Sequence, residues 1–159
     1  MVTYKKAVPD KYLAYKDIVD TVICYGWIDS LPRKLDDTRT MLLLSKRKPT
    51  SAWSAVNKEK VARMTTAGMM HPAGIAAVET AKQNGAWDIL NDVDAGVIPD
   101  DLCAALAAHP PAAAHFDSFS KSSRRGILEW ITLAKRPQTR ADRIAKTETL
   151  AAQNIKANH

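Results

Sequence analysis

Residues 34–57 read KLDDTRTMLLLSKRKPTSAWSAVN, and this stretch carries the signals of both a β-hairpin and a helix start. Asp36-Asp37 lies in a polar turn cluster, and residues 40–44 form an apolar run typical of a strand that is buried on both faces. Ser54 directly precedes a helical pattern and is one of the residue types that cap helix N-termini. We therefore predict an antiparallel hairpin near residues 30–47 and a helix that begins near Ser54.

Helical patterns fill most of the remaining chain. The predicted helices begin at capping residues or prolines and end at glycines or prolines, as helix termini commonly do. They cover residues 10–25, 54–67, 73–84, 99–109, a short segment with Phe116 and Phe119, 121–134 and 137–155. The expected fold is of the α+β class and predominantly α-helical, with the small hairpin packed by helices and a helical hairpin at the C-terminal end.

The length of 159 residues suits one domain that buries most of its apolar surface. We therefore expect a single domain over residues 1–159. Pro110-Pro111 interrupts the helical pattern and is the predicted seam between two lobes, residues 1–109 and 112–159.

The net charge of +6 is unevenly distributed along the chain. Residues 33–63 carry nine Lys/Arg against three Asp/Glu, residues 64–118 carry one lysine against seven acids, and residues 119–159 carry nine cations against three acids. Either these zones neutralise one another across the fold, or a basic face binds an anionic partner. The first interpretation is favoured.

The composition is that of an ordinary soluble globular protein, with 46% hydrophobic and 25% charged residues. No apolar run approaches the ~18–20 residues that span a bilayer, and the N-terminal segment lacks the apolar core of a secretory signal. Cys24 and Cys103 lie in apolar patterns without CxxC spacing, so we expect two buried, reduced thiols. These features predict a cytoplasmic protein without membrane insertion.

Three consecutive cations, Lys46, Arg47 and Lys48, stand shortly before the predicted helix start at Ser54. A helix N-terminus preceded by cations can bind an anion, but an exposed charged strand end with ordinary capping gives the same pattern. The loop contains no glycine, which argues against a phosphate-wrapping loop of the Walker type. Because side chains alternate along a strand, Arg47 should point inward while its two lysine neighbours point to solvent.

The favoured site is a cleft in which the segment from Trp27 to Asp29 faces the loop from Arg47 to Asn57. In this prediction Arg47 holds an anion or pairs with Asp29, Ser54 and Asn57 supply hydrogen bonds, and tryptophans form apolar walls. The candidate ligand-binding residues are Trp27, Asp29, Arg47, Trp53, Ser54 and Asn57. The two other tryptophans, Trp87 and Trp130, are predicted to lie in the core.

No pattern predicts a catalytic, metal-binding or cofactor-binding residue. Asp29 has no second carboxylate placed with it for acid–base work, the four histidines lack metal-ligand spacing, and no nucleophile elbow is present. An enzyme is therefore not favoured, and we expect no cofactor and no metal.

A basic surface on the C-terminal helices is a second candidate site, formed by Arg136, Arg140 and Arg143. Two helices joined by a short Lys-Arg-Pro-Gln turn are similar to a helix-turn-helix. The last helix is long and rich in alanine, and there is no aromatic platform on which bases would stack. Nucleic-acid binding is the less favoured alternative, and we expect these arginines to pair with the acidic middle segment.

Five ordered motifs resemble those of the YdeI/OmpD-associated family. They are YGWID at 25–29, KRKPTSAWSAVN at 46–57, AGMMHPAG at 67–74, AKQNGAWD at 81–88 and GILEWITLAKRPQTRADRI at 126–144. The likeness covers roughly residues 12–156. Lys46 stands where members commonly have proline, and the stretch that members carry before their first helix is missing or cut to a few residues.

The resemblance implies a role in bacteriocin protection or in antimicrobial and stress resistance, and it implies no catalytic residue. We therefore expect a non-catalytic binding protein of this type, whose partner is a small anionic ligand or a protein. The alternatives are a nucleic-acid-binding protein that uses the basic C-terminal helices and an undescribed enzyme that uses the same cleft.

Overall fold

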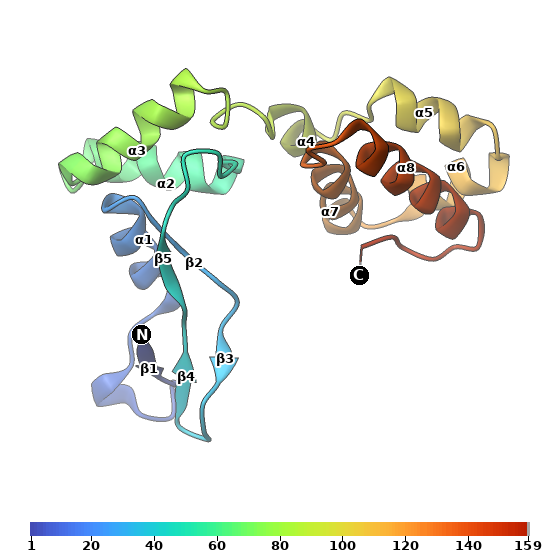
Figure 1. Cartoon of the computed structure of the whole chain (residues 1–159). Helices are drawn as coiled ribbons and strands as arrows, with labels where there is room; N and C mark the ends of the chain where they lie inside the picture. The colour runs from blue at the N-terminus through green and yellow to red at the C-terminus, as the bar shows by residue number, and fades with distance from the viewer. Residues whose placement is uncertain (159) are drawn as a thin grey trace. The chain divides into compact units, whose positions relative to one another are not determined.

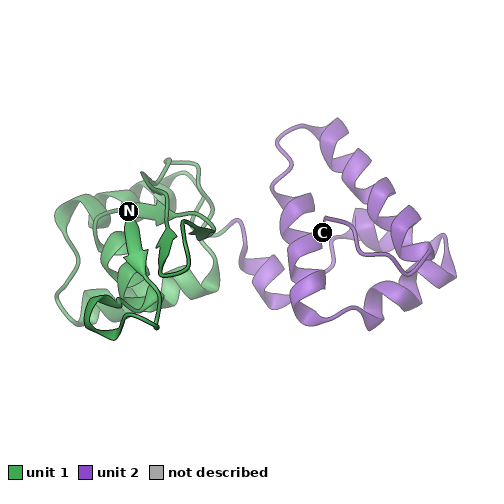
Figure 2. Ribbon diagram, turned by 90° about the horizontal axis from the view of Figure 1, so that it is seen from below, with its two compact units in different colours: residues 1–88 green, residues 89–159 purple. Residues whose placement is uncertain are grey.

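The computed structural model describes residues 1–158 and divides into two compact units, residues 1–88 and 89–159 (Figure 2). Helices dominate both units, and small antiparallel sheets occur in unit 1 (Figure 1). The predicted α+β, predominantly α-helical class is therefore confirmed. The prediction of one domain over the whole chain stays a prediction. Pro110-Pro111, the predicted seam, lies inside unit 2 at the start of a helix.

Unit 1 contains five short strands in two sheets. The strands are β1 (Val2–Tyr4), β2 (Trp27–Asp29), β3 (Arg33–Lys34), β4 (Arg39–Met41) and β5 (Leu44–Lys46). One antiparallel sheet has the order β1-β4-β3, and β2 pairs with β5 in the other. Strands β3 and β4 form the predicted hairpin, and the Asp36 carboxylate closes its turn by accepting bonds from the backbone N–H groups of Thr38 and Arg39 at 2.9 and 2.7 Å.

The prediction of one strand buried on both faces over residues 40–44 is wrong. The run is divided between β4 and β5, with Leu42 only 3% exposed and Leu43 70% exposed. The chain passes from one sheet to the other at this point, and the two leucines bond to different partners: Leu42 N–H donates to the Met1 carbonyl, and the Leu43 carbonyl accepts from Ser30 N–H. Alternate residues therefore face opposite ways, as in antiparallel sheets with one covered face.

Three helices complete unit 1 together with a short 3-10 turn at Pro9–Lys11. They are α1 (Tyr15–Cys24), α2 (Ala55–Thr66) and α3 (Pro72–Gln83). Each is followed by one of the predicted stop glycines, Gly26, Gly68 and Gly85, in the left-handed conformation that glycine adopts without strain. The first helix begins later than predicted, since residues 9–11 form the separate turn.

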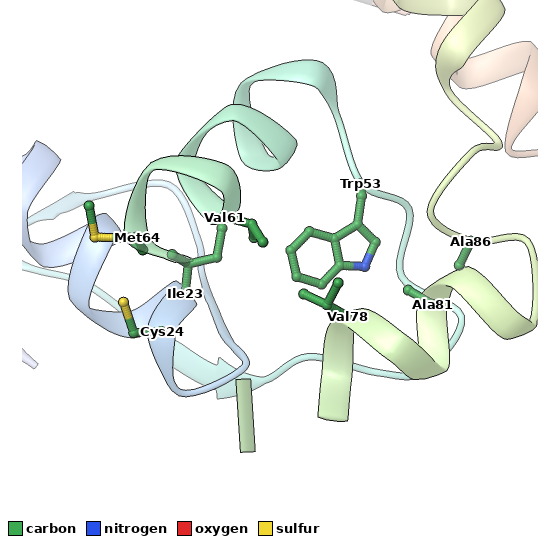
Figure 3. Packing of buried hydrophobic residues seen from close by; sticks show 8 residues of the cluster. All are labelled: Ile23, Cys24, Trp53, Val61, Met64, Val78, Ala81 and Ala86. Carbon is green, nitrogen blue, oxygen red and sulfur yellow. The ribbon is translucent and has the colours of Figure 1, made fainter. Parts of the chain in front are cut away.

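The core of unit 1 is built around Trp53, which is 1% exposed (Figure 3). The cluster takes side chains from all three helices and from the loop after α3: Ile23, Cys24, Val61, Met64, Val78, Ala81 and Ala86. The indole also lies 5.2 Å from the ring of Trp87, measured between centroids. Trp53 thus joins the loop after β5 to the helical layer.

Among its described residues, unit 2 contains helices and connecting loops but no strand. Its helices are α4 (Asn91–Ala95), α5 (Asp100–Ala107), α6 (Pro110–Ser118), α7 (Lys121–Thr132) and α8 (Pro137–Ala152). All except the short α4 were predicted. Leu102, Phe116 and Ile131 are fully buried in its core. Among the described residues of the whole chain, none of the helices is both long enough and apolar enough to span a bilayer.

The two cysteines are free thiols with different surroundings. Cys24 is buried as predicted, and burial raises the pKa of its thiol. The prediction is wrong for Cys103, which is exposed. Leu102 and Leu106 occupy the buried face of α5, and Cys103 follows Leu102 by one residue, so it lies on another face of the helix.

The predicted full burial of Trp87 and Trp130 is also wrong, because each indole is only half-buried, although Trp87 packs against the core cluster of unit 1. Trp130 on α7 is covered by charged side chains of α8: the Arg143 guanidinium lies 4.9 Å from the ring centroid, and the Lys146 ammonium lies 5.8 Å from it. Long cationic side chains cover aromatic surface with their stems while their charges stay near water. A helical spacing with apolar neighbours is compatible with half burial and with full burial, so the sequence pattern could not distinguish the two.

Replacing Trp130 with alanine is expected to lower the free energy of unfolding by about 1–2 kcal/mol, below the ~3–5 kcal/mol of a fully buried aromatic residue. Phe116→Ala is the comparison, since Phe116 is 0% exposed in the same unit. Urea unfolding followed by circular dichroism measures both losses. Equal losses for the two variants would contradict the half-buried position of Trp130.

Candidate functional site

A concave pocket of about 310 Å³ lies beside the three consecutive cations of the sequence, and we call it the Arg47 pocket. One side is formed by the end of α1 and by strands β2 and β5 with the loop that follows, through Tyr25, Gly26, Trp27, Lys46, Arg47, Lys48 and Pro49. The other side is a face of α3, through Ala73, Ala76, Ala77 and Thr80. The pocket is thus lined by three cations, two aromatic rings and a helix face of small residues.

Backbone pairing places the cations opposite the aromatic segment. Trp27 on β2 is the antiparallel partner of Lys46 on β5, and the Arg47 N–H donates to the Gly26 carbonyl at 2.9 Å. Gly26 has a φ of +72°, and a Cβ at this position would lie 3.0 Å from the Cβ of Ala77. A glycine is required here because the chain turns with a positive φ while it packs against α3.

Arg47 is half-buried, whereas Lys46 and Lys48 are exposed, so the predicted alternation of the three cations is confirmed. Its guanidinium stacks on Trp53, with 3.8 Å between Cζ and the ring centroid. One terminal nitrogen, Nη2, donates to the Ala52 carbonyl at 2.9 Å. The Nε–H group is buried and has no acceptor among the described residues. The arginine is therefore fixed in place while one of its donors is unused.

Burial lowers the pKa of Arg47 to about 10, and the negative charge of Asp29 acts in the opposite direction. The guanidinium is still charged at neutral pH. Within residues 1–158 no carboxylate lies within salt-bridge distance of it. A partly dehydrated cation without an ion-pair partner is costly to a fold, and an incoming anion offsets that cost.

Asp29 is bonded to a different group. Its carboxylate accepts a hydrogen bond from the Tyr15 hydroxyl, and this bond raises the pKa of the tyrosine to about 12. The aspartate lies on β2 two residues after Trp27, and it is not one of the residues that line the Arg47 pocket. The predicted pairing of Asp29 with Arg47 is therefore replaced by a Tyr15–Asp29 contact between α1 and β2.

Ser54 caps a helix, and Asn57 contributes only its backbone N–H to that cap. Ser54 is the N-cap of α2, and its hydroxyl accepts from the Asn57 N–H at 3.4 Å. Trp53, the third predicted residue of this loop, lies in the core behind Arg47 and contacts the guanidinium from that side. Of the six candidate residues, the structure brings only Trp27 and Arg47 to the pocket surface.

Sequence reasoning missed the face of α3 that forms one side of the pocket. Ala73, Ala76, Ala77 and Thr80 recur at the three- and four-residue spacing of one helix face. This spacing is visible in the sequence. Its small side chains carry no chemical signal of a site, and a small-residue face more commonly packs against another element.

The basic C-terminal surface is neutralised at one of its three arginines. Arg140 forms a two-point contact with Asp101, through Nε to Oδ2 at 2.7 Å and Nη2 to Oδ1 at 2.9 Å. Arg143 has no acidic partner among residues 1–158, but it donates to the Trp130 carbonyl and stacks on its ring, while Arg136 is exposed. The predicted pairing with the acidic segment is therefore confirmed for Arg140 and wrong for Arg136 and Arg143.

The two units also differ in charge. Residues 89–159 carry nine Lys/Arg and eight Asp/Glu, a net charge of +1, whereas residues 1–88 carry fourteen and nine, a net charge of +5. The positive charge of the chain is thus concentrated in the unit that holds the Arg47 pocket. This distribution weakens the case for a nucleic-acid surface on the C-terminal helices.

The Arg140–Asp101 pair is expected to make stability depend on pH. The bonds from Arg140 lower the pKa of the Asp101 carboxyl below its ordinary value of about 4. Because the folded-state pKa is the lower one, the pair stabilises the fold fully above pH ~4 and loses this effect as the pH falls through the lowered pKa. Both side chains are partly exposed, so the effect should be about 0.2–1 kcal/mol.

The free energy of unfolding should fall between about pH 5 and about pH 2, and part of this fall comes from the Arg140–Asp101 pair. In Arg140→Gln the fall should therefore be smaller by about 0.2–1 kcal/mol, as measured by urea unfolding. Arg136→Gln removes an equal charge from the exposed start of α8 and should leave the acid-induced loss unchanged. If acid lowers the free energy of unfolding of Arg140→Gln as much as that of the unmodified protein, the pair has no effect on stability.

Two family models match separate parts of this chain. Residues 1–77 match a domain of unknown function, DUF8412, and residues 95–154 match the family described as bacteriocin-protection, YdeI or OmpD-associated. Comparisons with curated proteins and with solved structures gave no match. The resemblance to the YdeI/OmpD-associated family is therefore confirmed over residues 95–154. The motifs at 25–29, 46–57 and 67–74 lie instead in the part that matches the first model.

Proposed function

We propose that unit 1 binds a small anionic ligand in the Arg47 pocket and that the protein acts through binding rather than catalysis. The observation that carries the proposal is the state of Arg47. Its guanidinium is half-buried, has no carboxylate partner among the described residues, and keeps a buried Nε–H without an acceptor. Unsatisfied buried donors are uncommon in folded proteins, and they often mark a position that a ligand or ion completes.

The surroundings of Arg47 favour an anion. Lys46 and Lys48 lie at the edge of the pocket with their side chains exposed, so all three cations attract negative charge toward the same opening. The stack on Trp53 holds the guanidinium plane in one orientation. A fixed guanidinium binds carboxylate or phosphate oxygens with less loss of side-chain entropy than a mobile one.

The bacteriocin-protection description of the matched family supports a protective role at the level of the family. We propose that this role is exercised in the cytoplasm, with ligand binding in unit 1 coupled to a protective activity of the protein. The residues that line the pocket are mainly cations, aromatic rings and alanines, which suits recognition of a ligand better than proton transfer.

Replacing Arg47 with methionine should abolish the binding of inorganic phosphate while changing the free energy of unfolding by less than about 1 kcal/mol. Methionine keeps an apolar stem against Trp53, and exchanging a buried ion for a hydrophobic residue of similar volume is often neutral or stabilising. The lost bond to the Ala52 carbonyl opposes this gain. Isothermal titration calorimetry measures binding, and urea unfolding measures stability.

Arg33→Met is the matched control, because it removes one positive charge from an exposed strand position of the same unit. It should leave phosphate binding intact apart from a small general electrostatic effect. Equal weakening of binding in the two variants would mean that phosphate responds to the overall charge of unit 1 and not to the pocket.

A further inference from the structure

The shape of the Arg47 pocket carries an inference about the class of ligand, which rests on the proposed function. A pocket for a bare inorganic anion needs only polar donors, but much of this pocket is apolar. Trp27 and Tyr25 lie on one side, and Ala73, Ala76 and Ala77 lie on the other. The volume of about 310 Å³ lies in the range of sites for organic molecules.

The aromatic side of the pocket is exposed although its rings are large. Trp27 is 37% exposed and Tyr25 is 50% exposed, so both rings leave apolar surface in contact with water. The Tyr25 ring is held in place by stacking on His71, with centroids 4.7 Å apart. His71 in turn accepts the Ala73 N–H through Nδ1 at the start of α3. The aromatic side is therefore tied to the same helix that forms the opposite side.

The small side chains of α3 leave room opposite these rings. Ala73, Ala76 and Ala77 present methyl groups to the pocket, and the tight contact of Gly26 with Ala77 fixes the distance between helix and strand. A flat apolar group can contact an alanine face and an aromatic ring at the same time. A ligand that covers apolar surface in a concave site removes this surface from water, and this contributes favourably to binding.

The cations that line the pocket indicate which charged group the ligand carries beside its flat apolar part. Three cations line the pocket, and the Nε–H of Arg47 is buried without an acceptor among the described residues. A phosphate group carries up to two negative charges and three acceptor oxygens near neutral pH, and it suits such a cluster better than a single carboxylate. We infer that the ligand is a small aromatic phosphate monoester, with its phosphate at Arg47 and its ring between Trp27 and the alanine face of α3.

The inference is tested by comparing phenyl phosphate with methyl phosphate, which share the charged group and differ in the ring. Titration calorimetry on the full chain should give at least about tenfold tighter binding for phenyl phosphate, because burying a ring contributes on the scale of one large apolar side chain. Trp27→Ala should remove most of this preference, because it weakens phenyl phosphate much more than methyl phosphate.

Ala76→Leu is the second variant, and it tests the opposite side of the pocket without touching a charged or aromatic residue. Leucine is a good helix former, so α3 should be retained, while the larger side chain fills the space for the ring. It should weaken phenyl phosphate at least about fivefold more than methyl phosphate, by reversing the gain from ring burial.

The possible failures are distinct. Equal affinity for the two phosphates, or equal weakening of both by Trp27→Ala and Ala76→Leu, would overturn the aromatic assignment while the anion pocket stands. Failure of both compounds and of inorganic phosphate to bind the unmodified chain would overturn the proposed function itself.

Discussion

Trp53→Ala is expected to lower the free energy of unfolding of unit 1 by about 3–5 kcal/mol, the range for removing a large aromatic side chain from a core. The indole is 1% exposed and is surrounded by side chains of α1, α2 and α3, so its loss leaves a cavity that these helices cannot easily close (Figure 3). It also removes the ring contact with Trp87 and the surface on which Arg47 stacks.

Trp27→Ala is the matched control for this prediction, since Trp27 is 37% exposed and lines the pocket instead of the core. Trp27→Ala should lower the free energy of unfolding by less than about 1 kcal/mol, as substitutions at most exposed positions do. Urea unfolding followed by circular dichroism is suitable for both variants. Losses of equal size would show that Trp53 is not the centre of the core in unit 1.

Gly74→Ala is expected to have the second largest effect, a loss of about 3 kcal/mol, at the upper end of the range for overpacking. Gly74 lies near the start of α3, where a Cβ would stand 2.0 Å from the carbonyl oxygen of Cys24 at the end of α1. The obstacle is backbone, so no side-chain rotation relieves the clash. The two helices must separate, and the hydrogen bond from His71 N–H to the same carbonyl oxygen is disturbed.

Gly126→Ala provides the control for helix propensity. Gly126 lies inside α7, and a Cβ there would meet no atom within 4 Å. Alanine should therefore stabilise unit 2 by about 0.5–1 kcal/mol, because it loses less backbone entropy on folding than glycine does. A neutral or stabilising effect of Gly74→Ala, like that of this control, would contradict the close packing of α1 on α3.

Helix ends were the part of the fold that could be predicted most closely. Gly26, Gly68 and Gly85 each adopt a positive φ after a helix, and Ser54 is the N-cap of α2. These signals are local, because a cap or a left-handed residue is set by the chain within one turn of the helix. The hairpin turn at Asp36-Asp37 is local in the same sense.

The short strands at the sheet edges could not be predicted in this way. Strand β1 has three residues and pairs with Arg39–Met41, far along the chain, and β2 pairs with Leu44–Lys46. Three residues are too few to show an alternating pattern, and the pairing depends on tertiary contacts. The strand predicted over residues 40–44 failed for the same reason, since its apolar run supplies two different sheets.

The site was predicted in part. The inward position of Arg47 follows from strand alternation, and the structure confirms it. A serine such as Ser54 is suited both to capping a helix and to binding a ligand, so the sequence could not separate the two roles. Asp29 was a predicted partner of Arg47, and its actual contact with the Tyr15 hydroxyl requires a strand, β2, that the sequence did not predict.

The central claim is that Arg47 binds an anion through a donor that the fold leaves unused. The most direct measurement is a titration of the full chain with inorganic phosphate, in which the Nε–H resonances of the arginine side chains are followed by ¹H–¹⁵N NMR. We predict that the Arg47 Nε–H signal, identified by its loss in Arg47→Met, shifts to a saturating value while that of the exposed Arg33 stays nearly unchanged. An Arg47 signal that does not move, or that shifts in parallel with all other arginines as ionic strength rises, would contradict the claim.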